Sequence, residues 1–87
     1  MNQYVGELLV YIGPHKVETE QFYKVSLDQL IKRALTLKGD VKSLVQYREQ
    51  SGEYKNLNKK QKAVTIKLQG KFSNDEWKQF NKAVNRG

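Results

Sequence analysis

Residues 24–40 read KVSLDQLIKRALTLKGD and contain the clearest structural signals of the chain. Ser26 suits the N-cap position of a helix, and Gln29, three residues later, completes a capping-box pattern. The apolar residues that follow recur at the i, i+3, i+4, i+7 and i+8 positions of one buried stripe. We expect a helix over 27–38 that ends at Gly39, because glycine is favoured in the left-handed conformation after a helix.

The residues before this helix predict two strands. Residues 3–12 are rich in β-forming side chains, and Gly13 and Pro14 end that run with a strong turn signal. Residues 16–25 alternate in the manner of a second strand. We therefore expect a β-hairpin across this turn.

Two further alternating segments follow the helix. Residues 41–50 place Val41, Val45 and Tyr47 on one side, and residues 62–69 also alternate. We expect each segment to form a strand. A polar connector joins them.

A second helix start lies near the end of the sequence. Ser73 and Glu76 repeat the capping-box pattern, and the helix should cover residues 74–85. Its apolar stripe is Trp77, Phe80 and Val84. The similarity of the two helix starts indicates either a duplicated unit or only the shared requirements of helix capping.

The expected order of elements is ββαββα, in a single domain over residues 1–87. A chain of 87 residues that is 38% hydrophobic can bury one modest core, so we expect no second domain within it. With no cysteine, it has no disulfide and no thiolate metal site. The simplest packing is an α+β fold in which two helices cover one face of a four-stranded antiparallel sheet.

Charge is distributed unevenly along the chain. The first 30 residues hold 2 basic and 4 acidic residues, whereas the rest hold 14 basic and 5 acidic residues, for a net charge of +7. The electrostatic field of such a chain favours binding to polyanions, and to nucleic acid before a membrane surface. The candidate nucleic-acid-binding residues are Arg48, Tyr54, Lys55, Lys59, Lys60, Lys62 and Lys67.

The cations of this set would contact phosphates, and Tyr54 would stack on an unpaired base. Lysine outnumbers arginine, and it lacks the bidentate fork that reads guanine, so we expect sequence-tolerant binding of DNA or RNA. The alternative is a solvated loop whose lysines serve only to keep the protein in solution.

A second hypothesis concerns the sheet, because the predicted first strand is apolar on both sides. Two helices cover one face, which would leave a patch for a protein partner or a homodimer. Its candidate residues are Val5, Leu9, Tyr11, Phe22 and Leu44. The protein would then be an adaptor or inhibitor of the kind carried by mobile genetic elements. Alternatively, the first strand is central in the sheet, or the connector covers the patch.

The sequence offers little for catalysis. His15, the only histidine, lies in a predicted turn, and the carboxylates have no metal-ligand or acid–base pattern. The longest apolar run, residues 8–12, is far shorter than the ~20 residues that cross a bilayer, and no signal peptide pattern is present. We expect a cytoplasmic, non-enzymatic protein with no cofactor, metal, membrane association or small-molecule substrate.

Overall fold

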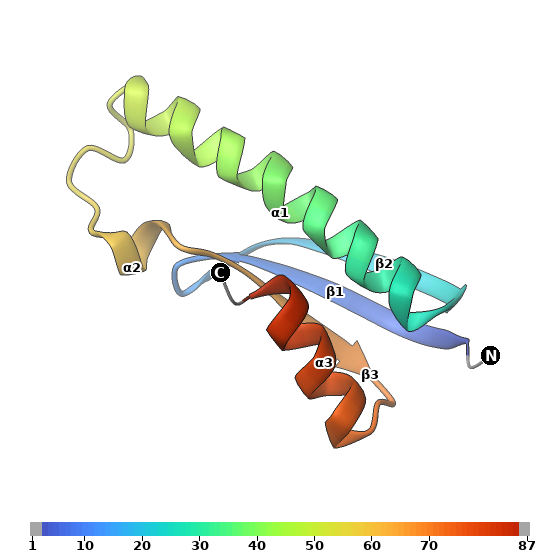
Figure 1. The fold of residues 1–87 in the computed structure, drawn as a ribbon. Coiled ribbons are helices and arrows are strands. Elements are labelled where there is room, and N and C mark those ends of the chain that lie inside the picture. The colour runs from blue at the N-terminus through green and yellow to red at the C-terminus, as the bar shows by residue number, and fades with distance from the viewer. Residues whose placement is uncertain (1–2, 86–87) are drawn as a thin grey trace.

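Three antiparallel strands and three helices form the structure of residues 3–85, the part of the chain that the computed structural model describes (Figure 1). The α+β class is confirmed, but the ββαββα order and the four-stranded sheet are wrong. The elements are β1 (Tyr4–Ile12), β2 (His15–Val25), α1 (Leu27–Gln50), α2 (Lys59–Lys62), β3 (Val64–Gly70) and α3 (Asn74–Val84).

The main correction concerns α1, which is a helix of 24 residues. Residues 41–50 continue this helix instead of forming a strand, and Gly39 lies inside it without a positive φ. The buried residues of α1 are spaced by three or four along its whole length, so one apolar stripe continues past the glycine. They are Leu30, Ala34, Leu37, Val41 and Val45.

Burial of this stripe outweighs the cost of about 1 kcal/mol for a glycine inside a helix. Tyr47, which the strand prediction placed beside Val41 and Val45, is 68% exposed. An alternating pattern over a few residues is therefore compatible with a helix when only its most apolar members are buried.

Both predicted helix starts are confirmed. The Ser26 hydroxyl accepts from the Gln29 N–H at 3.2 Å, and the Gln29 side chain accepts from the Ser26 N–H at 2.9 Å. Ser73 and Glu76 make the same two bonds at the start of α3. These bonds satisfy N–H groups that a helix start leaves without partners.

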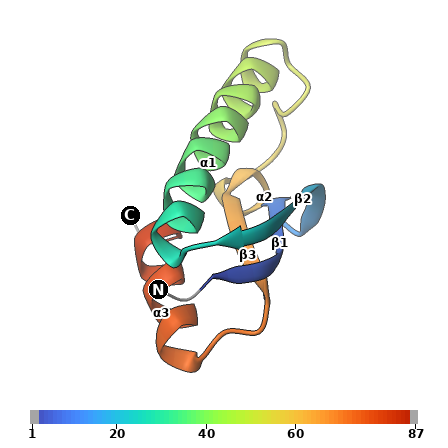
Figure 2. The same cartoon turned by 90° about the vertical axis from the view of Figure 1, so that its right-hand side faces the viewer.

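In the sheet, β1 is the central strand and the order is β2-β1-β3. The register places Leu8 opposite Glu20 on one side and opposite Leu68 on the other. Both α1 and α3 lie on the same side of the sheet (Figure 2). The core between them contains Leu8, Val10, Ile12, Val64, Ile66, Leu68, Phe80 and Val84, together with the buried stripe of α1.

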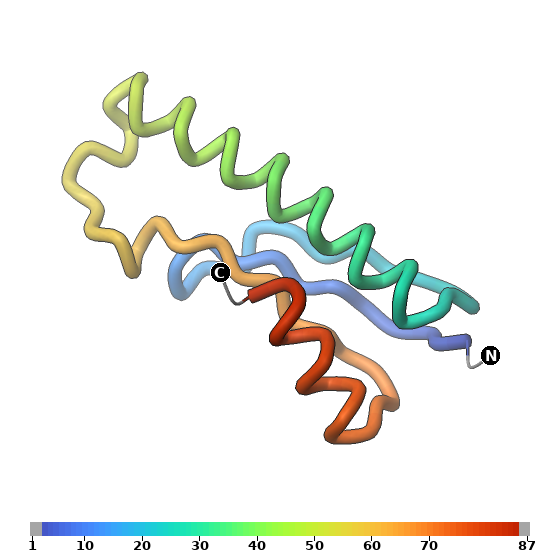
Figure 3. The backbone as a smooth tube through the Cα atoms, viewed as in Figure 1, coloured from blue at the N-terminus to red at the C-terminus, as the bar shows by residue number. Residues whose placement is uncertain are grey.

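The chain returns to the sheet through a long connector from the far end of α1, which the tube in Figure 3 follows. The connector covers residues 51–63 and includes α2, whose capping box joins Asn58 and Gln61. The last strand begins at Val64, two residues after the predicted start. Between residues 3 and 85, no helix combines the length and apolar character required to cross a membrane.

Candidate nucleic-acid interface

Three of the predicted nucleic-acid-binding residues hold the connector against α1. One guanidinium nitrogen of Arg48 donates to the Tyr54 hydroxyl at 2.6 Å, and its Nε lies 3.5 Å from a Glu53 carboxylate oxygen. The Lys62 ammonium lies 3.2 Å from a Glu49 carboxylate oxygen. Use of these side chains by a ligand would therefore disturb contacts that order the connector.

The ring of Tyr54 is also engaged within the protein. It is half-buried against the hydrophobic core, and the Arg48 guanidinium lies 5.5 Å from its centroid. Tyr54 also lines a pocket of about 360 Å³, together with Pro14, His15, Glu53, Leu57 and Gln61. Tyr54 therefore helps to hold the connector, and its predicted stacking role stays a prediction.

Lys55, Lys59 and Lys60 are different, because they are exposed and form no ion pair with the described carboxylates. Two of them lie on α2, where the Asn58 and Gln61 capping box fixes the backbone. The connector thus presents three ammonium groups from a short, ordered segment. This is the part of the predicted set that is best placed for phosphate contacts.

Lys67 lies elsewhere, on the uncovered face of the sheet. It pairs with Leu9 of β1, and its ammonium lies 4.7 Å from the centroid of the Tyr11 ring. This is a cation–π arrangement, which holds the ammonium over an aromatic ring. The fold therefore separates Lys67 from the lysines of the connector and places it with part of the predicted partner patch.

The predicted partner patch does not form one surface. Leu9 and Tyr11 lie half-buried on the uncovered face, and Val5 is 55% exposed there. Phe22 instead packs against the core, with its ring centroid 6.3 Å from that of Phe72. Leu44 lies on α1 and not on a strand. The patch that remains consists of Val5, Leu9 and Tyr11, because Phe22 faces the core and the predicted fourth strand that carried Leu44 is part of a helix.

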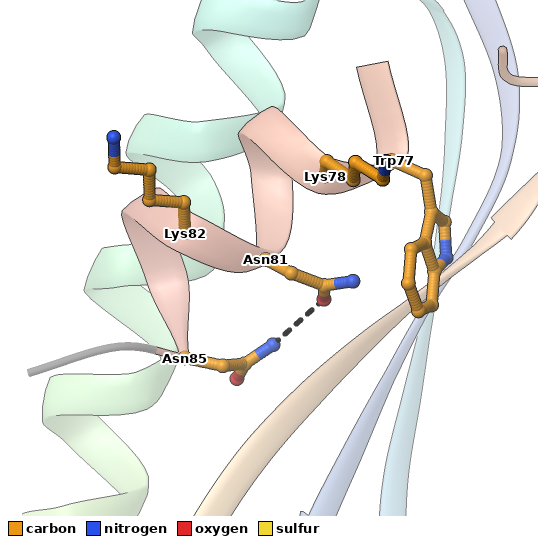
Figure 4. A pocket seen from close by; sticks show the side chains of 5 residues that line it. All are labelled: Trp77, Lys78, Asn81, Lys82 and Asn85. Atoms are coloured by element: carbon orange, nitrogen blue, oxygen red, sulfur yellow. Dashed lines mark hydrogen bonds between the residues drawn. The ribbon is translucent and has the colours of Figure 1, made fainter. Parts of the chain in front are cut away.

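A groove that the sequence did not predict lies along α3. Trp77, which the helix periodicity assigned to the core with Phe80 and Val84, is 50% exposed, whereas the other two are buried. The groove has a volume of about 480 Å³ (Figure 4). It is lined by Trp77, Lys78, Asn81, Lys82 and Asn85.

Asn85 fixes the position of α3 beside the sheet. Its side-chain nitrogen donates to the Ile66 carbonyl at 2.7 Å, and its side-chain oxygen accepts from the Ile66 N–H at 2.9 Å. One amide therefore pairs both polar backbone groups of a residue on the outer edge of β3. The spacing of Trp77, Asn81 and Asn85 by four residues is the sequence signal that could have revealed this helix face.

Within residues 3–85, no group of three or more histidine, cysteine, aspartate or glutamate side chains could hold a metal ion. Glu20 is held by two hydrogen bonds from Arg33, at 2.6 and 2.7 Å. These bonds are the main reason why the pKa of Glu20 lies below its usual value.

Comparisons with protein-family models, curated proteins and solved structures find no match to this chain. The features of the chain that bear on its function are the exposed lysines of the connector, the uncovered sheet face and the groove beside Trp77.

Proposed function

We propose that the protein binds nucleic acid without catalysis and without strong sequence preference, through phosphate contacts from exposed lysines. The observation that carries this proposal is the small share of cations neutralised within the protein. The chain has 16 lysines and arginines, and three of those in residues 3–85 form ion pairs with carboxylates. Neutralisation of the others by phosphates would release condensed counterions, which favours binding to any sequence.

Lys55, Lys59 and Lys60 supply the main contacts in this proposal. Their ammonium groups act as point charges, so they position a phosphate backbone without reading bases. Arg48 and Lys62 support this surface indirectly, because they anchor the connector to α1.

The proposal is tested by fluorescence anisotropy of end-labelled single-stranded DNA, duplex DNA and RNA at about 50 and 200 mM salt. We expect micromolar or tighter binding at the lower salt concentration and a steep loss at the higher one. Absence of binding to all three probes at the lower salt concentration contradicts the proposal.

A double variant, Lys59→Ala with Lys60→Ala, tests the role of the connector. It should weaken binding to different sequences about equally and reduce the slope of log K against log salt by about two units. Lys16→Ala with Lys32→Ala is the matched control, because it removes the same charge from exposed positions on β2 and α1. Equal losses of affinity in both double variants would show that binding depends only on net charge.

The uncovered sheet face supports a second candidate function, the binding of a protein partner or a second copy of the chain. Val5, Leu9 and Tyr11 lie on this face without a covering helix. Leu9→Lys should abolish self-association measured by analytical ultracentrifugation, while phosphate binding remains. Leu44→Lys, an exposed position on α1, is the control. A monomeric wild-type protein at high concentration would exclude the homodimer.

A further inference from the structure

The residues that line the groove beside Trp77 all belong to α3 or to its C-cap, Asn85. Trp77, Asn81 and Asn85 follow one another at intervals of four residues, so they share one side of α3. Asn85 binds the backbone of Ile66, which places this side of the helix along the outer edge of β3. Figure 4 shows the indole, which is 50% exposed, and the two asparagine side chains along this side of the helix.

The groove also presents hydrogen-bond donors. The Asn85 side chain donates to the Asn81 side-chain oxygen at 3.1 Å, which fixes the orientation of the Asn81 amide. The Asn81 amide nitrogen then points toward the indole, as Figure 4 shows. Within residues 3–85, neither this nitrogen nor the indole N–H donates a hydrogen bond to another protein group.

The charge of the groove has one sign. Lys78 and Lys82 line it, and no carboxylate does. Both lysines are exposed and form no ion pair with the described acidic residues. A ligand that fits this lining has a flat ring, hydrogen-bond acceptors on the edge of that ring, and a nearby negative charge.

We propose that this groove binds one unpaired base of a single-stranded nucleic acid, stacked on Trp77. The Asn81 amide donates to an acceptor on the base edge, and Lys78 and Lys82 contact the flanking phosphates. The inference rests on the proposed nucleic-acid-binding function and assigns it a site outside the basic connector. Because every base has an aromatic face, stacking of this kind tolerates different sequences.

Trp77 is the only tryptophan of the chain, so intrinsic fluorescence reports directly on the groove. The experiment is a titration of the full chain with unlabelled oligothymidylate at about 50 mM salt, beside a duplex of matched length. We expect the single strand to quench the fluorescence strongly and the duplex to quench it weakly. Equal quenching by both contradicts the binding of an unpaired base.

Trp77→Ala provides an independent measurement, with affinity determined from the anisotropy of a dye-labelled oligothymidylate. Loss of one stacked base should weaken binding about 5-fold to 150-fold. Trp77→Phe keeps an aromatic ring and should lose less affinity than Trp77→Ala. Tyr47→Ala is the control, because Tyr47 is an exposed aromatic residue on α1. The affinity of this variant for oligothymidylate should differ from that of the wild type by less than about twofold.

The outcomes separate this inference from the function on which it rests. If oligothymidylate binds but neither quenches Trp77 nor loses affinity in Trp77→Ala, the groove is excluded and the connector remains the proposed interface. If no nucleic acid binds, both proposals fail. Equal quenching by poly-glutamate would show a general anion site and overturn base binding. Circular dichroism of Trp77→Ala and Trp77→Phe identifies any loss of affinity that comes from misfolding.

Discussion

Gly13 and Gly39 occupy similar sequence contexts but adopt opposite structures. Each follows a segment predicted to be a strand or a helix and precedes a residue that favours turns, Pro14 and Asp40. Gly13 has a φ of 58° in the hairpin turn, and its N–H donates to the Ala63 carbonyl at 2.8 Å. Gly39 lies inside α1. A glycine permits a turn, whereas the burial of the residues that follow determines whether the chain makes one.

The largest expected effect is at the first of these glycines. In Gly13→Ala, the new Cβ would lie 2.5 Å from the Gln61 carbonyl oxygen, at a backbone conformation that side chains disfavour. The conformational strain alone is about 1–2 kcal/mol, and displacement of the α2 backbone adds to it. Urea denaturation should show destabilisation of at least this size. An unchanged free energy of unfolding would contradict the turn geometry.

The second expected effect tests the helix beyond Gly39. Val45→Ala removes two methyl groups from a buried position and should cost about 1.6 kcal/mol. Tyr47→Ala, at an exposed position two residues later, should stay within about 0.5 kcal/mol of the wild type. A strand over residues 41–50 would bury both side chains on one face and give comparable losses. Urea denaturation of the two variants therefore distinguishes helix from strand.

A smaller effect of opposite sign is expected at the second glycine. A Cβ on Gly39 would meet no atom within 4 Å, and alanine is the better helix former. Gly39→Ala should therefore stabilise the protein by about 0.5–1 kcal/mol, measured by thermal and urea denaturation. Destabilisation would indicate that Gly39 ends the helix, as its sequence context predicts.

The smallest effect concerns the ion pair that joins β2, after the Gly13 turn, to the half of α1 before Gly39. Hydrogen bonds from Arg33 lower the pKa of Glu20 from its usual value of 4.5. The pair therefore stabilises the fold fully above pH 4.5, and this contribution is lost as the pH falls through the lowered pKa. Glu20→Gln should remove that part of the acid sensitivity.

Urea denaturation of the wild type and Glu20→Gln at about pH 7 and pH 3 measures this difference. The wild type should lose slightly more stability than the variant on acidification. The difference is small because both side chains are accessible to solvent, which screens their attraction. An equal loss in the two proteins would show that the pair contributes nothing measurable.

Local chemistry explains which parts of the fold the sequence predicts. The capping boxes at Ser26 and Ser73 and the turn at Gly13 involve residues only a few positions apart, and all three are present. The sequence prediction of the end of α1 was wrong because that end depends on tertiary packing, which buries Val41 and Val45 in the core. Tertiary packing overrides a local stop signal in this case.

The candidate sites show the same difference between local features, which the sequence predicts, and contacts between distant segments, which it does not. The basic character of residues 48–67 is visible in the sequence, but the engagement of Arg48 and Lys62 depends on the position of the connector against α1. The attachment of α3 to β3 likewise depends on the hydrogen bonds between Asn85 and Ile66. Neither contact follows from periodicity, because each joins segments that meet only after the chain has folded.

The central position of β1 has a consequence for the order of folding. Ile12 pairs with His15 across a tight turn, but it pairs with Val64 across more than half of the chain. A hairpin forms in about 1–10 μs, whereas closure of the long loop carries a larger entropic cost. We expect the return of β3 to limit the refolding rate, and stopped-flow fluorescence of Trp77 on α3 would follow it. A refolding rate as fast as hairpin formation would contradict this order, in which β1 pairs with β2 before it pairs with β3.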